Sequence, residues 1–198
     1  MKIFAFVDVH DNKKAMDEIR SKVEMHNPDI IINAGVISIF ENNIEILVEF
    51  LAKLKKPVLN LHGNHETYEM LFMLCGLHNN LICFHCDTHR IGNYLFLGHG
   101  GGGFSRYDTE FERVSKKFRK EIKEDDKVIL ITHGPPFRTN LDKVGKDHVG
   151  NKSYRKFIES NKVDLAISGH IHETAGASDV IGRTKLLNPG PFGKLIIL

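Results

Sequence analysis

The sequence predicts an α/β protein built on a largely parallel β-sheet with helices packed against it. Short apolar runs alternate along the chain with longer stretches whose apolar residues recur at helical spacing, which is the pattern of consecutive βαβ units. The runs are nearly continuous, so they indicate strands that are buried on both faces. Several runs end directly before Asp, Asn or His, which suggests that these polar side chains gather at strand ends.

The first half of the chain contains three predicted strands separated by two helices. The predicted strands run from Ile3 to Val7, from Ile30 to Ile32 and from Val58 to Leu61. The first helix is capped by Asn12 and has Ala15, Ile19, Val23 and His26 on one face. The second helix has the apolar face Ile44, Leu47, Val48, Leu51 and Leu54. Pro28 and Pro57 end the two helices, because the residue before a proline disfavours helical geometry.

The second half is less regular but continues the alternation. Its first predicted elements are a short helix at Leu71 to Leu74, strands at Leu81 to Phe84 and Tyr94 to Leu97, and a helix with the face Phe111, Val114, Phe118 and Ile122. They are followed by a strand from Val128 to Ile131, a helix carrying Tyr154, Phe157 and Ile158, and a strand from Asp164 to Ser168. A turn at Asn188 to Gly190 separates the last two strands, the second of which runs from Leu195 to Leu198. The glycine-rich stretch from Gly98 to Gly103 is predicted to be a loop.

Length and composition favour one globular domain spanning residues 1–198. The net charge is only +2 and no basic stripe with interleaved aromatic residues is present, which argues against a nucleic-acid partner. No apolar stretch reaches the about 20 residues that a membrane helix needs, and the N-terminal run is too short for a signal peptide. We therefore expect a cytoplasmic protein with no membrane partner, and the sequence leaves a homo-oligomer open.

Three cysteines make too small and uneven a set for a disulfide framework. Cys83 and Cys86 have the spacing of a CxxC motif, but no second pair completes a zinc site, so we interpret them as structural. The same interpretation applies to six histidines, which are expected to be hydrogen-bonded residues without a catalytic role: His62, His78, His85, His89, His99 and His148.

The remaining polar residues at strand ends form a metal-type donor set. They are Asp8, His10, Asn64, His65, His133, His170 and His172. In extended backbone, residues two apart point the same way, so both members of the 8/10 and the 170/172 pair are expected to reach one site. One carboxylate, one amide and several imidazoles suit Zn, Mn, Fe or Ni better than Ca or Mg.

In order and spacing, these residues resemble the motifs of the calcineurin-like metallophosphoesterases. The matching segments are Asp8-x-His10, Gly63-Asn64-His65-Glu66, the lone His133, and Gly169-His170-x-His172. The stretch from Thr132 through Gly190 is most similar to the small phosphodiesterase-type members of prokaryotes. The resemblance implies a sandwich of two mixed β-sheets flanked by helices, with two divalent transition metal ions (Mn, Ni, Fe or Zn) at one edge.

The resemblance also implies roles for individual residues. Asp8, His10 and His172 would hold the first metal, and Asn64, His133 and His170 the second. His65 would be the catalytic residue, protonating the leaving oxygen while a metal-activated hydroxide attacks a small phosphoester substrate, more specifically a diester. Glu66 would support the loop without binding metal.

One family residue is missing, because Val36 stands where the family has its metal-bridging Asp. Two divalent ions about 4 Å apart repel by roughly 16 kcal/mol at an effective dielectric of 20, so the loss of a bridging charge matters. Three outcomes follow: an exogenous anion bridges two metals, only the Asp8 side binds a single metal, or the protein binds a ligand or partner without turnover. The predicted function is thus a phosphoesterase whose activity Val36 reduces, with an inactive binding protein as the alternative.

Overall fold

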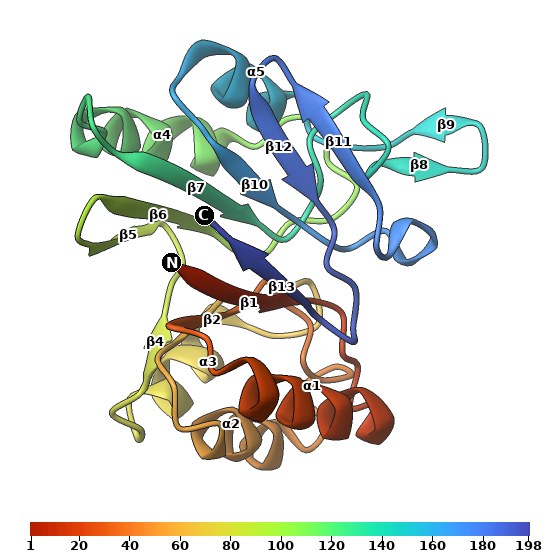
Figure 1. Cartoon of the computed structure of the whole chain (residues 1–198). Coiled ribbons are helices and arrows are strands. Elements are labelled where there is room, and N and C mark those ends of the chain that lie inside the picture. The colour runs from red at the N-terminus through yellow and green to blue at the C-terminus, as the bar shows by residue number, and fades with distance from the viewer.

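The computed structural model describes all 198 residues, and its architecture is a four-layer sandwich (Figure 1). Two sheets face one another, with α1, α2 and α3 covering the outer face of one and α4 and α5 the outer face of the other. The first sheet has the strand order β13-β1-β2-β3-β4 and the second has the order β11-β12-β10-β7-β6-β5. A small hairpin of β8 and β9 lies apart from both sheets.

The strands of the first sheet are β1 (Lys2–Phe6), β2 (Ile30–Asn33), β3 (Val58–Asn60), β4 (Leu81–Cys83) and β13 (Lys194–Ile197). The second sheet contains β5 (Asp87–Ile91), β6 (Tyr94–His99), β7 (Lys127–Thr132), β10 (Leu165–Ile167), β11 (Ser178–Ile181) and β12 (Thr184–Leu187), and the hairpin contains β8 (Lys143–Val144) and β9 (Asp147–His148). The helices are α1 (Lys13–His26), α2 (Ile44–Lys53), α3 (Tyr68–Cys75), α4 (Thr109–Glu121), α5 (Lys152–Ser160) and the 3-10 turn η1 (His172–Thr174).

Both sheets are mixed. β1 to β4 run parallel and β13 joins β1 antiparallel, while the antiparallel strands β5 and β11 form the two edges of the second sheet. This confirms the predicted fold class of two mixed sheets flanked by helices.

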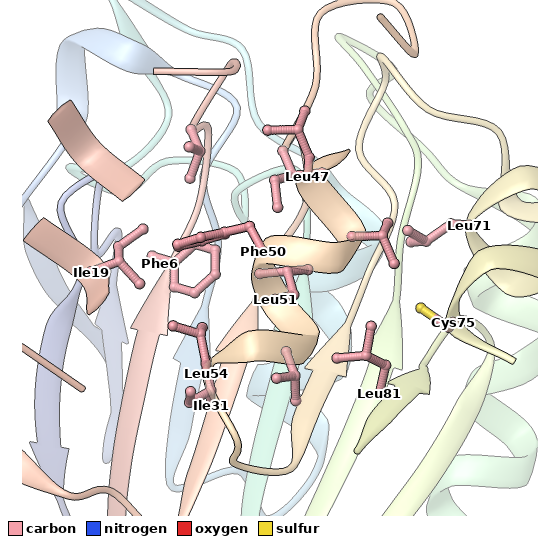
Figure 2. Packing of buried hydrophobic residues seen from close by; sticks show 14 of the residues in the cluster. Phe6, Ile19, Ile31, Leu47, Phe50, Leu51, Leu54, Leu71, Cys75 and Leu81 are labelled. Atoms are coloured by element: carbon pink, nitrogen blue, oxygen red, sulfur yellow. The ribbon is translucent and has the colours of Figure 1, made fainter. Parts of the chain in front are cut away.

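Alternation along each strand divides the core into layers. Along β1 and the residue after it, Ile3, Ala5 and Val7 face the second sheet, whereas Phe4 and Phe6 face the helices. Figure 2 shows the helix side of this arrangement, where the apolar face of α2 lies over the first sheet. The five residues predicted for that face are all buried. Burial on both faces explains why these strands appear in the sequence as continuous apolar runs.

The local predictions hold where the periodicity is strong. Asn12 caps α1 as expected, with its side chain accepting a hydrogen bond from the amide of Ala15. The glycine-rich segment is corrected at its start, because Gly98 and His99 belong to β6 and pair with β7. None of the helices combines the length and apolar character needed to cross a bilayer.

Candidate functional site

The predicted site residues lie where strands of both sheets end. Asp8 and His10 follow β1, Asn64 follows β3, and His133 follows β7 directly. His170 and His172 come after β10. These parallel strands present their carboxyl ends at the same edge of the sandwich, so loops distant in sequence can meet there. The structure brings the six predicted ligands together as two groups joined by Asp8.

The first group consists of Asp8, His10 and His172. Their ligand atoms all lie within 4.8 Å of one another, and Nε2 of His10 is 2.9 Å from Nε2 of His172. Asp8 Oδ2 accepts a hydrogen bond of 2.8 Å from the amide of His170. The other oxygen, Oδ1, is buried and has no hydrogen-bond partner. Two facing imidazole nitrogens beside an unsatisfied carboxylate oxygen are a donor set that fits a cation.

The backbone that presents this group is not extended, which corrects the sequence-based reasoning about residue pairs. Asp8, His10 and His170 have φ values of 57°, 50° and 69°, in the left-handed region. Such conformations cost free energy for non-glycine residues and concentrate at functional sites. The first loop is held by the amide of Asp8, which donates to the carbonyl of Gly35 at 3.0 Å. The paired residues therefore converge through tight turns and not through strand geometry.

The second group consists of Asn64, His133 and His170. Asn64 Oδ1 lies 3.0 Å from His133 Nε2 and 3.2 Å from His170 Nδ1. His133 Nδ1 is 3.0 Å from the carbonyl oxygen of Ala34, which can only accept, so the ring proton lies on Nδ1. Nε2 then carries a lone pair that faces the amide oxygen of Asn64. A cation between these donors removes the repulsion between their lone pairs, so this group also fits a metal ion.

Asp8 links the two groups. Its Oδ1 lies 4.0 Å from His133 Nε2, although the carboxylate belongs to the first group. No Asp or Glu other than Asp8 is among the predicted ligands, and Val36 provides no donor atom. The Asp8 carboxylate, which is the negative charge among the predicted ligands, thus lies close to both ligand groups.

Burial sets the protonation of these ligands. It raises the pKa of Asp8 to about 6, against the opposing effects of His172 and the His170 amide. Burial, together with neighbouring imidazoles, lowers the pKa of His10 to about 4 and that of His133 to about 3. Burial also lowers the pKa of His170. At neutral pH these imidazoles are uncharged, which is the form that binds metal.

His65 lies beside the first group at the mouth of a cavity of about 290 Å³. Its ring meets that of His10 edge-on, with centroids 4.9 Å apart, and stacks on the ring of Phe40 at 4.3 Å. Phe40 is 71% exposed, and sequence reasoning did not identify it, because it lies in a loop without periodicity. His65 therefore faces the same space as the two ligand groups and is oriented by an aromatic neighbour.

Glu66 supports the loops around the site, as the sequence predicts. Its carboxylate accepts hydrogen bonds from the amides of Val36, Ser38 and Gly63 and from the Ser38 hydroxyl. Residue 63 must be glycine for lack of space, since a Cβ there would overlap Val36 Cγ2. Val36 itself is buried with φ 54°, a conformation that β-branched residues rarely adopt.

The chain is similar to known proteins in sequence and in fold. A family model described as calcineurin-like phosphoesterase matches residues 1–174. The uncharacterised protein MJ1162 of Methanocaldococcus jannaschii is 32% identical over 202 residues, which cover 96% of this chain and 88% of that protein. Two solved structures share the fold: TT1561 of Thermus thermophilus (TM-score 0.77, 14% identity, 96% of this chain and 88% of that one) and phosphopantetheinyl hydrolase of Mycobacterium tuberculosis (TM-score 0.71, 13% identity, 99% and 95%).

Proposed function

The chain belongs to the calcineurin-like phosphoesterases, and from this membership and the site geometry we propose that it hydrolyses a small phosphodiester with two divalent transition metal ions. The observation that carries the proposal is the convergence of the two donor groups on Asp8. Asp8, His10 and His172 would hold one ion, and Asn64, His133 and His170 the other. Bound ions of this kind supply Lewis-acid activation of the phosphoryl oxygen and a water nucleophile at neutral pH.

In this proposal His65 is the catalytic residue. It lies next to His10 without belonging to either ligand group, so its imidazole is free to move a proton. It would donate that proton to the oxygen of the leaving group, which departs as a neutral alcohol. The stacked ring of Phe40 limits the rotation of His65 and keeps its edge toward the cavity. His170 and Asn64 border the same cavity, so a phosphoryl group there would lie between the acid and the ligands.

A second candidate function is phosphoester binding without turnover. The observation that favours it is Val36, which leaves Asp8 as the single carboxylate among the predicted metal ligands. Against it stands the backbone at residue 36, whose φ of 54° suits Asp or Asn better than a β-branched side chain. The loop thus has a conformation that a carboxylate residue tolerates, and Glu66 holds it through a hydrogen bond from the amide of Val36.

An assay on an aryl phosphodiester and the corresponding monoester, with Mn²⁺, Ni²⁺, Fe²⁺ or Zn²⁺ added, separates the two functions. A phosphodiesterase turns over the diester faster. His65→Ala is expected to lower kcat by about 10²–10⁴-fold, the usual contribution of a general acid, while bound metal measured by elemental analysis stays unchanged. Absence of turnover with every metal, despite retained phosphoester binding, would support the binding protein.

Val36→Asp tests the missing carboxylate directly. The new side chain fits the left-handed backbone and adds a negative charge beside the ligand groups, so metal stoichiometry and diesterase rate are expected to rise together. Val36→Asn is the matched control, because it relieves the same backbone strain without the charge. If Val36→Asn raises both quantities as much as Val36→Asp does, relief of strain and not the carboxylate limits the site.

A further inference from the structure

A second group of ligand-type side chains lies where β4 and β6 end. This group, the Cys86 cluster, consists of His85, Cys86, His99 and Glu110, whose ligand atoms all lie within 4.8 Å of one another. Cys86 Sγ is 3.4 Å from His99 Nδ1 and 3.2 Å from His85 Nε2, and His85 Nε2 is 3.5 Å from the Glu110 carboxylate. Cys83 does not belong to the cluster; its free thiol lies beside that of Cys75. The neighbours of Cys86 in the cluster are therefore not the residues of the CxxC motif.

His99 has the orientation of a metal ligand. Its Nε2 lies 2.9 Å from Asp108 Oδ2, an oxygen that also accepts from the Tyr154 hydroxyl at 2.8 Å. Burial favours a neutral Asp108, but hydrogen bonds from His99, the Phe111 amide and Tyr154 outweigh it and lower the pKa of Asp108. The ionised carboxylate fixes the His99 proton on Nε2, so the Nδ1 lone pair points at Cys86. A histidine that binds metal through one ring nitrogen commonly donates the N–H of the other to a carboxylate, which fixes the orientation of the ring.

His85 has a different role. The amide of Gly100 donates to His85 Nδ1 at 3.1 Å, so the proton of the neutral ring lies on Nε2. That N–H is directed at Cys86 Sγ and Glu110. His85 is therefore a hydrogen-bond donor to the sulfur, which stabilises a thiolate, and not a ligand itself. Three candidate ligand atoms remain: one sulfur, one imidazole nitrogen and one carboxylate oxygen.

We propose that the Cys86 cluster binds a divalent cation of the zinc class through Cys86 Sγ, His99 Nδ1 and the Glu110 carboxylate. Zinc bonds of about 2.3 Å to sulfur and about 2.0 Å to nitrogen at a tetrahedral angle separate the two ligand atoms by roughly 3.5 Å, and the observed separation is 3.4 Å. Cys86 and Glu110 border a groove of about 400 Å³ together with Tyr68 and Arg113, so a fourth ligand could enter from this groove. Three protein ligands and one open position are typical of zinc that exchanges its fourth ligand.

Two carboxylates lie close to the Cys86 sulfur. Burial and the nearby Glu110 and Asp108 carboxylates raise the pKa of the Cys86 thiol to about 12, against the opposing effects of Arg113 and Lys117, and a bound cation would displace this proton. Three imidazoles pack in series, with ring centroids of His62 and His85 4.6 Å apart and those of His85 and His99 5.2 Å apart. Burial and the other two imidazoles lower the pKa of His62 to about 3, so His62 contributes no positive charge. A bound cation would add positive charge beside Glu110, whose carboxylate lies 3.7 Å from the Arg113 guanidinium.

Cobalt(II) added to the reduced 198-residue protein tests the proposal. Thiolate-to-cobalt charge transfer gives near-ultraviolet absorption, and the Asp8 site contains no sulfur donor, so cobalt bound there does not contribute to this absorption. We expect the absorption to level off at the intensity of one cobalt–thiolate centre per chain, whatever amount of cobalt the Asp8 site also binds, and to disappear when zinc is added. Cys86→Ser should abolish it, whereas the matched variant Cys83→Ser should retain it. Asp108→Asn, which changes a positioning residue, should weaken cobalt affinity about 10–100-fold.

Folding of each variant is checked by circular dichroism and thermal melting. If Cys86→Ser does not fold, alkylation of Cys86 in the wild-type protein, mapped by mass spectrometry, replaces it: added zinc should protect Cys86 at least tenfold more than Cys83. Absence of cobalt–thiolate absorption in the reduced wild type overturns the proposal. So does absorption that persists in Cys86→Ser, or alkylation of Cys86 that zinc leaves unchanged. Because none of these measurements uses phosphoester turnover, they stand whether or not the proposed activity does.

Discussion

Two clusters at the same edge of the sandwich, the Asp8 site and the Cys86 cluster, are built by the same device. In each cluster, polar side chains lie in the loops that follow the carboxyl ends of neighbouring strands. These strands are β1, β3, β7 and β10 for the Asp8 site and β4 and β6 for the Cys86 cluster. Each also contains a histidine whose proton is fixed by an acceptor behind it: the Ala34 carbonyl for His133 and the Asp108 carboxylate for His99. Histidines at strand ends thus present ring-nitrogen lone pairs, which can bind metal, at more than one place along this edge.

The clusters differ in their donors and in their carboxylates. The Asp8 site offers oxygen and imidazole nitrogen, which suit a hydrolytic metal such as Mn²⁺, while the Cys86 cluster adds sulfur, which selects softer ions. Asp8 receives one backbone hydrogen bond and its pKa is raised, whereas Asp108 receives three hydrogen bonds and its pKa is lowered. Asp8 is thus a poorly compensated charge, which suits the role of metal ligand that we propose for it, and Asp108 is a compensated charge, which suits the proposed role of orienting a ligand.

Asp8→Asn tests the first half of this contrast and should have the largest effect. It removes the single carboxylate of the site, so metal content should fall and diesterase activity should drop on the order of 1000-fold, since metal stabilisation of the transition state amounts to several kcal/mol. In metal-free protein the same change should raise the melting temperature at pH 7, because the cost of burying the charge disappears. Steady-state kinetics, elemental analysis and calorimetry measure the three quantities.

That experiment is informative because the two expected effects have opposite signs: activity falls, whereas the stability of the metal-free protein rises. A variant that loses both activity and metal-free stability would mean that Asp8 serves the fold and is not a charge kept for a ligand. The cobalt–thiolate absorption of the Cys86 cluster serves as an internal control, because Asp8→Asn should leave it unchanged.

Phe40→Ala should have an intermediate effect. The ring of Phe40 stacks on His65 at an interplanar angle of 18°, and such contacts are worth about 0.5–1.5 kcal/mol. Its loss should lower kcat by up to about tenfold through a less well oriented acid, with metal content unchanged. Phe72→Ala, at an exposed phenylalanine of α3, is the matched control and should leave kcat as it is. A change in KM alone would assign Phe40 to substrate binding instead.

The elements that sequence predicts well are those with strong periodicity. The apolar face of α2 and the strands β1, β2 and β7 are buried, and their apolar residues recur in a pattern that predicts this burial directly. The strands that sequence reasoning missed, β5, β8, β9 and β11, lie in the small hairpin or at sheet edges and lack an apolar run. Pairing with a neighbour, and not composition, makes them strands.

The same contrast holds for the two clusters: the sequence predicts residues that follow buried strands, and it does not predict contacts between distant segments. The seven residues singled out from motifs converge because each motif follows a buried strand, which the sequence reveals. The left-handed backbone at Asp8 and His10 leaves no periodic signal, and neither does the stacking of Phe40 on His65. The sequence did not predict the Cys86 cluster, because Glu110 joins it from α4, Cys86 was interpreted as structural, and His85 and His99 were interpreted as hydrogen-bonded residues. Contacts between distant segments depend on packing that a single sequence does not state.

Asp126, a buried carboxylate outside both clusters, provides the baseline for Asp8 and the smallest predicted effect. The Arg90 guanidinium holds the pKa of Asp126 below its usual range through two hydrogen bonds. A lowered folded-state pKa means that ionised Asp126 stabilises the fold above about pH 4, the unfolded-state value, and that this contribution is lost as pH falls through the folded-state pKa. Asp126→Asn should therefore lower the melting temperature by about 2–4 °C at pH 7, corresponding to about 1 kcal/mol, and the difference from wild type should shrink toward pH 3. Melting curves of metal-free protein across this range measure it. If Asp126→Asn and Asp8→Asn shift the melting temperature in the same direction at pH 7, the distinction between a charge kept for the fold and a charge kept for a ligand fails.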